Sequence, residues 1–101
     1  MPYLQAIWKE HFFAIGGFDE TFTAAICGQD NDYRDRILRY GCKLIYTEAR
    51  CVHLKHEPWL TSDEFNKRRK VGVDLWKLNQ AYNVIVVNED IEWGKFDDCT
   101  I

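Results

Sequence analysis

Hydrophobic and polar positions along this chain follow two different periods. Apolar side chains recur at helical spacing over residues 33–40, and over a longer span at residues 62–82. Residues 42–47, 50–54 and 83–88 are instead short runs that are rich in strand-forming side chains. The pattern therefore predicts an α+β fragment: a short mixed sheet, an amphipathic helix after an acidic loop, and a longer C-terminal helix.

The ends of the two predicted helices carry recognisable signals. Asp30 or Asn31 can serve as the N-cap of the first helix, and Gly41 is a natural residue to terminate it. Residues 61–64, with the sequence TSDE, form a helix start signal that allows a capping box. Gly72 weakens the middle of the second helix, because glycine is a poor helix former.

A third, shorter helix is predicted near the start of the chain. Residues 8–15 place aromatic and aliphatic side chains at helical spacing, and the Gly16-Gly17 pair closes the segment. We expect Phe18 to enter the core, and Asp19 and Glu20 to act as capping groups in the turn that follows.

Composition and charge exclude several classes of protein. A chain of 101 residues that is 47% hydrophobic can form one compact domain. The net charge of -3 gives no basic field for nucleic acid, so we expect no nucleic-acid partner and interpret the basic run at residues 67–70 as a solvated helix face. No apolar stretch has the length of a membrane span, and the first residues lack a signal-peptide pattern. We therefore expect a cytoplasmic protein that reaches the inner face of a membrane only through other parts of a full protein.

The cysteines do not form a recognisable framework. No C-x-x-C pair occurs, which argues against a zinc ribbon and a dense disulfide network and favours reduced thiols. A weaker alternative is a zinc site made by Cys51, His53 and His56. The four cysteines are Cys27, Cys42, Cys51 and Cys99.

The candidate chemistry lies in the acidic loop at residues 28–32, with the sequence GQDND. Asp30 and Asp32 are too close in sequence to share a helical face, so we expect them to have different roles. The loop also looks like the opening of a calcium-binding EF-hand. That interpretation fails, because Arg34 stands where an oxygen ligand is needed and Gly41 where a bidentate Glu is needed.

Several short motifs follow one another in a specific order. Residues 15–20 read IGGFDE, the acidic loop follows, and residues 36–41 and 48–53 read RILRYG and EARCVH. This series resembles the C-terminal half of family 2 glycosyltransferases with the GT-A fold. In that family a GGFDE motif precedes a G-x-E-D-x-D loop, then a helix, a strand and a His. The resemblance covers about residues 6–53, and the ordered combination is more specific than any single motif.

The resemblance implies transfer of a sugar from a nucleotide-sugar donor to a hydroxyl of a carbohydrate or lipid-linked acceptor. The catalytic base of the family falls on Asp30, which would take the proton of that hydroxyl. Gln29 stands where the family has Glu, so it can hydrogen-bond to an acceptor but cannot carry charge. Asp32 and Trp59 are the other candidate acceptor-binding residues.

The resemblance also implies a divalent metal, Mn or Mg, in a full-length enzyme. His53 matches the family's His by its spacing from Ala49, and His56 is the runner-up as a metal ligand. The isolated chain should bind no such ion tightly, since a hard cation held by one imidazole keeps its water shell.

The same resemblance divides the chain. Residues 1–60 would be the acceptor-side part of a catalytic domain, and residues 61–101 a C-terminal helix, strand and tail. The nucleotide-binding half would precede Met1, so we expect this hexosyltransferase-like chain to be inactive alone and to form a homodimer that covers exposed apolar surface. The competing hypothesis is a non-enzymatic module that binds carbohydrate or associates with itself.

Overall fold

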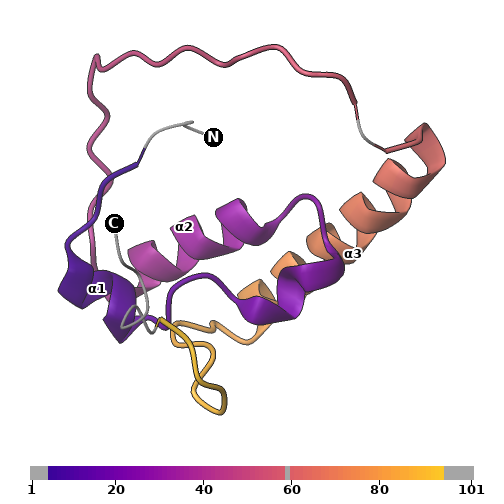
Figure 1. The fold of residues 1–101 in the computed structure, drawn as a ribbon. Helices are drawn as coiled ribbons and strands as arrows, with labels where there is room; N and C mark the ends of the chain where they lie inside the picture. The colour runs from indigo at the N-terminus through magenta and orange to yellow at the C-terminus, as the bar shows by residue number, and fades with distance from the viewer. Residues whose placement is uncertain (1–4, 59, 95–101) are drawn as a thin grey trace.

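The computed structural model describes residues 5–58 and 60–94 and consists of helices joined by irregular segments (Figure 1). Helix α2 packs against α3, and α3 also packs against the short 3₁₀-helix η1. Thus helices on both sides of the predicted boundary at residue 60 pack together. The elements in chain order are α1 (Lys9–Ala14), η1 (Glu20–Ala24), α2 (Gln29–Tyr40) and α3 (Ser62–Ala81).

The apolar core is small. It is formed by Ile15, Tyr33 and Ile37, and partly buried side chains such as Phe12 pack against it. Phe18 stacks on the Tyr33 ring, with 4.3 Å between the ring centroids, but remains 44% exposed. Phe18 therefore lies at the edge of the core, where we had expected it to lie inside.

The predicted α+β fold is wrong, because the structure contains no strand in residues 5–58 and 60–94. Residues 42–47 and 50–54 lie along an open arc that bends between them, and they do not fold back on each other (Figure 1). A strand exists only through hydrogen bonds to a neighbouring strand. The composition of these runs gives a local preference and cannot supply that partner.

The predicted strand at residues 83–88 is also absent. The N–H of Val87 donates to the carbonyl of Ile15 at 3.2 Å, but no ladder follows within the described residues. The carbonyls of Val84 and Ile85 accept hydrogen bonds from the side chains of Arg39 and Arg36. Arginine side chains thus satisfy the backbone groups that a neighbouring strand would have bound.

Helix α2 begins earlier than its capping signals predict. Its N-cap is Gly28, with φ 97°, so the prediction of Asp30 or Asn31 as the cap is wrong. A Cβ atom at Gly28 would lie 2.4 Å from the carbonyl oxygen of Gly72 in α3, so contact between the two backbones selects glycine there. The prediction for the other end is confirmed, because Gly41 ends the helix with φ 116°.

Helix α3 agrees closely with its predicted range. The Oγ1 atom of Thr61 accepts the N–H of Glu64 at 3.3 Å, as a capping box requires. The Glu64 carboxylate instead pairs with Arg68 one turn later, at 3.0 Å. At 20 residues α3 is the longest described helix, and no helix in the described part of the chain is apolar and long enough to cross a membrane.

The N-terminal predictions are largely confirmed. Helix α1 lies within the predicted range 8–15, and Gly16 and Gly17 follow it with φ values of 82° and 67°. Asp19 is the N-cap of η1, and its Oδ1 atom accepts the N–H of Thr21 at 3.0 Å. These turns direct the chain from α1 towards the start of α2.

Gly72 has a packing role that its low helix propensity does not reveal. It is buried, and a Cβ atom there would lie 1.5 Å from the carbonyl oxygen of Cys27. Helix α3 therefore touches the loop before α2 through its backbone, with no side chain between them. Gly72 allows the two segments to approach.

We predict that Gly72→Ala destabilises the protein by more than about 2 kcal/mol, because the added methyl group overpacks this contact. Helix propensity alone predicts the opposite sign, a gain of about 1 kcal/mol. Urea unfolding followed by circular dichroism measures the change. Lys70→Ala, at an exposed position of the same helix, is the matched control and should be nearly neutral; a stabilised Gly72→Ala protein would contradict the packing role.

Candidate functional site at the start of α2

A buried ion pair lies one turn into α2. The Nε atom of Arg36 donates to the Oδ2 atom of Asp32 at 2.8 Å, and both side chains are fully buried. The two residues are four apart, which is the spacing of ion pairs on a helix. Sequence reasoning could see this spacing, but not that the pair lies in the core.

The rest of the Arg36 guanidinium binds backbone carbonyls from other segments. Its Nη2 atom donates to the carbonyl of Gly17 at 2.7 Å, and its Nη1 atom donates to the carbonyls of Ile15 at 3.0 Å and Ile85 at 3.4 Å. A guanidinium carries five N–H donors in a fixed plane, so one side chain can bind several acceptors at once. Arg36 thereby joins the segment after α1, helix α2 and the segment after α3.

The second oxygen of Asp32 is also engaged. Its Oδ1 atom accepts a hydrogen bond from Nδ2 of Asn79 in α3 at 2.8 Å, and the same amide donates to Oδ2 of Asp19 at 3.0 Å. Both carboxylate oxygens of Asp32 therefore face partners inside the protein. The structure places this candidate acceptor-binding residue in the core.

Asp30 has a different environment. It is half-buried, and within the described residues its carboxylate accepts one hydrogen bond, from the N–H of Asn31 at 2.9 Å. The two acidic side chains of the loop therefore differ as their spacing predicted: Asp32 binds the core, whereas the carboxylate of Asp30 keeps acceptor capacity for another group.

Gln29 precedes Asp30 and is partly committed to the loop. Its Nε2 atom donates to the carbonyl of Ile26 at 3.1 Å. Its Oε1 atom is buried and accepts no hydrogen bond from the described residues. A buried amide oxygen without a donor is costly, and because this atom is buried, no group from outside reaches it in this arrangement.

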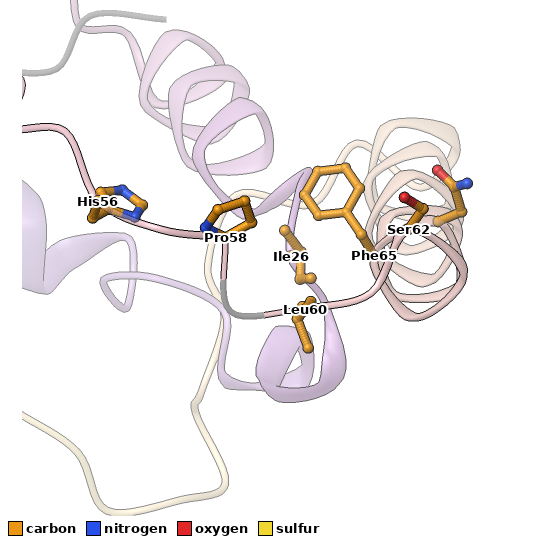
Figure 2. Close-up of a pocket in the computed structure, with 7 residues that line it drawn as sticks. Ile26, His56, Pro58, Leu60, Ser62 and Phe65 are labelled. Carbon is orange, nitrogen blue, oxygen red and sulfur yellow. The ribbon is translucent and has the colours of Figure 1, made fainter.

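A hollow lies between the loop before α2 and the start of α3 (Figure 2). It has a volume of about 570 Å³, and neither Gln29 nor Asp30 is among the residues that line it. Carbon-rich side chains form much of its wall, with a few polar groups at the edge. The lining residues are Ile26, His56, Pro58, Leu60, Ser62, Phe65 and Asn66.

The candidate metal ligands lie outside the helical core. His53 and His56 are both exposed, and their ring centroids are 5.6 Å apart. Nowhere in residues 5–58 and 60–94 do three His, Cys, Asp or Glu side chains come together as metal ligands would, so Cys51 does not complete a zinc site with them. The remaining candidate, Trp59, lies outside the described residues.

Sequence reasoning missed a second polar contact between α2 and α3. The indole Nε1 of Trp76 donates to Oδ2 of Asp35 at 2.7 Å, and Gln80 donates to the same oxygen at 3.2 Å. Burial raises the pKa of Asp35, but hydrogen bonds from Trp76 and Arg34 outweigh it and hold the pKa below its usual value. The helical spacing of Trp76 suggested only an apolar role.

Tyr33 joins the aromatic and polar parts of the core. Burial raises the pKa of its hydroxyl above the ordinary value, and the nearby Arg36 charge partly opposes this shift. Its ring packs on Phe18 and Phe12. From the predicted tail, Trp93 docks on this group by stacking on Phe13, with 5.2 Å between the centroids.

Comparison of the chain with protein-family models, with curated proteins and with solved structures finds no match. Any assignment of function therefore depends on the residues and geometry described above.

We predict that Asp32→Asn destabilises the protein by about 3–5 kcal/mol, the usual cost of removing one partner from a buried ion pair. An amide would turn its N–H donors towards Arg36 or Asn79, which are themselves donors, and would leave the guanidinium charge unpaired. Thermal unfolding measures the loss. Glu64→Gln removes the exposed pair with Arg68 and should cost less than about 1 kcal/mol; equal effects of the two variants would contradict a buried structural pair.

We also predict that Asp35 contributes to acid sensitivity. Its pKa is lower in the folded protein than in the unfolded chain, so its carboxylate stabilises the fold at neutral pH. That contribution is lost as the pH falls below about 4, through the ordinary carboxyl range and the lower folded pKa. In Asp35→Asn the free energy of unfolding should fall less steeply with acidification over this range. Asp74→Asn, at an exposed position, is the control, and an unchanged acid slope in Asp35→Asn would refute the role.

Proposed function

We propose that this chain is the acceptor-side part of a glycosyltransferase, which moves a sugar from a nucleotide-sugar donor to a hydroxyl of a carbohydrate or lipid-linked acceptor. The observation that carries this proposal is that the two aspartates of the acidic loop have different environments. Both carboxylate oxygens of Asp32 accept hydrogen bonds, from Arg36 and Asn79, whereas the half-buried carboxylate of Asp30 remains able to accept a proton. Asp30 is also the residue on which the base of the resembling family falls.

The proposed chemistry needs one base on the acceptor side. As the new bond forms between the acceptor oxygen and the sugar carbon, the acceptor O–H bond breaks and the proton passes to the Asp30 carboxylate. The bond from the sugar to the nucleoside diphosphate breaks in the same step, and the diphosphate leaves with the bonding electrons. The rigid start of α2 holds the base in position, because Asp32 anchors the following residues in the core.

The neighbouring groups suggest how an acceptor would bind. Gln29 is the adjacent candidate acceptor-binding residue, but its Oε1 atom is buried, so an acceptor hydroxyl would reach it only if the loop opens. The hollow beside Ile26 offers carbon-rich walls for a sugar ring, with His56 and Ser62 as polar groups at its edge (Figure 2). Such a mixture is typical of sites that bind sugars through both their faces and their hydroxyls.

A divalent ion, Mn or Mg, remains a prediction that the described residues do not support by themselves. His53 and His56 could supply two nitrogen ligands, and in the described residues no third candidate joins them. Mg²⁺ prefers oxygen ligands, and a hard cation of this kind keeps its water when protein ligands are few. We therefore derive no step through a metal and leave both histidines as candidate ligands for a site completed elsewhere.

We predict that Asp30→Asn lowers the rate of sugar transfer by about 10²–10⁴-fold, the usual cost of losing a general base. The measurement is transfer from nucleotide-sugar donors by the longest gene product that contains residues 1–101. Donor binding, measured by calorimetry, should remain nearly unchanged, because Asp30 acts on the acceptor.

Two controls make this result specific. Asp63→Asn changes an exposed aspartate in the first turn of α3 and should leave transfer unchanged. The helical circular dichroism of Asp30→Asn should equal that of the unchanged protein, since Asp30 bonds only locally. Normal turnover in Asp30→Asn would refute the assignment. Glycan binding without any transfer would favour the non-enzymatic module.

A further inference from the structure

The segment at residues 43–57 is a long extended arc that leaves the helical part of the molecule (Figure 1). All its residues are exposed, and its apolar side chains are among the most exposed in the protein: Ile45 is 84%, Tyr46 79% and Val52 86% exposed. No backbone group of residues 43–52 bonds to another backbone group in the described part of the chain. Residues 43–52 therefore offer N–H and C=O groups that have no backbone partner, together with apolar side chains.

The large exposed surface agrees with this view. The accessible area is 8528 Å², whereas a compact monomer of 12.0 kDa exposes about 6000 Å². Several of the exposed large apolar residues lie in the arc, at Leu44, Ile45, Tyr46, Val52 and Leu54.

The arc carries a self-complementary pattern. In an extended chain, alternate residues share a face. One face of residues 44–54 therefore reads Leu, Tyr, Glu, Arg, Val, Leu. The acidic and the basic residue lie next to each other at the centre, with two apolar residues before them and two after them. When a second copy of this face is aligned in the reverse direction, each acidic residue lies opposite a basic one and each apolar residue lies opposite an apolar one. The residues are Leu44, Tyr46, Glu48, Arg50, Val52 and Leu54.

We propose that two copies of this chain associate by antiparallel pairing of residues 44–54 about a two-fold axis at Ala49. In this register Glu48 of each copy lies opposite Arg50 of the other, so the ion pair forms twice. The flanking positions also match: Tyr46 faces Val52, and Leu44 faces Leu54. The partner surface is thus a second copy of the same segment, as in isologous dimers formed by strand addition.

The charges select this register over its neighbours. Shifting the pairing by two positions in one direction places Arg50 opposite Arg50, and the opposite shift places Glu48 opposite Glu48. Like charges directly opposite each other destabilise a pair of strands, whereas opposite charges stabilise it. A shift by a single position would mix the two faces and lose the match of apolar residues.

The bend in the arc is compatible with this pairing. The Oγ1 atom of Thr47 accepts the N–H of Ala49 at 3.3 Å, which bends the chain near the centre of the segment. If the Ala49 pair is of the non-hydrogen-bonded kind, that N–H lies outside the ladder. Because the two-fold axis passes through Ala49, both copies bend at the same level and both arms can pair. The pairing does not depend on the proposed sugar transfer.

The test uses two charge variants of the full 101-residue chain and measures association by sedimentation equilibrium. Glu48→Arg gives a copy with two positive charges at the centre, and Arg50→Glu gives a copy with two negative charges. Each variant alone should dimerise about ten- to a hundredfold more weakly than the unchanged protein, since attraction becomes repulsion in two pairs. An equal mixture should recover the dimer as a heterodimer of the two variants.

Controls distinguish pairing in the proposed register from nonspecific association. Glu57→Arg lies in the arc beyond the proposed pairing segment and should leave the dimer intact. Circular dichroism should show unchanged helix in all variants, because the arc lies outside the core. A monomeric unchanged chain at all concentrations, larger open-ended aggregates, or a mixture that stays monomeric would each overturn the proposal.

A second readout locates the axis. In a Cys51→Ser background, Ala49→Cys should form an intermolecular disulfide under mild oxidation faster than Ile45→Cys does, because only position 49 faces its own copy. Faster cross-linking of Ile45→Cys would assign a different register and refute the one proposed.

Discussion

The buried guanidinium of Arg36 is the interaction on which the helical part of this protein depends. It binds the carboxylate of Asp32 and carbonyls of Ile15, Gly17 and Ile85, which belong to segments far apart in the sequence. Its burial is costly unless these partners are present, so the charge enforces one arrangement of the segments around it. With three buried apolar residues in the main cluster, this core derives its specificity from polar contacts more than from apolar volume.

A guanidinium can reach so many carbonyls only if the backbones come close together, and glycines permit this approach. A Cβ atom at Gly16 would lie 2.0 Å from the carbonyl oxygen of Val87, so glycine lets the segment after α3 approach the end of α1. Gly28 and Gly72 likewise let the loop before α2 approach the middle of α3. The contact at Gly16 thus brings residues 85–87 close to the segment whose carbonyls Arg36 also binds.

The sequence allowed the helices to be predicted, because helix signals are local. The periodicity of residues 62–82, the Thr61 cap and the Gly41 terminator all act within one or two turns. The sheet was predicted wrongly, because the strand-forming composition of residues 42–47 indicates only a local preference for extended backbone. It does not indicate whether a neighbouring strand is present. The start of α2 was misjudged for a related reason: contact with Gly72, more than 40 residues away, selects Gly28 as the cap.

The candidate site shows the same limit. Spacing alone indicated that Asp30 and Asp32 would differ, but the assignment of Asp32 to the core required knowledge of Arg36 and of Asn79 in α3. Once Asp32 is committed, the start of α2 cannot shift or unwind without exposing a buried charge, and this fixes where the carboxylate of Asp30 lies. The position of the Asp30 carboxylate thus depends on the buried carboxylate of Asp32. The hydrogen bonds of Arg36 and Asp32 join the helices and the segments beside them, whereas residues 43–57 are exposed, so the polar contacts hold the acidic loop more firmly than the arc.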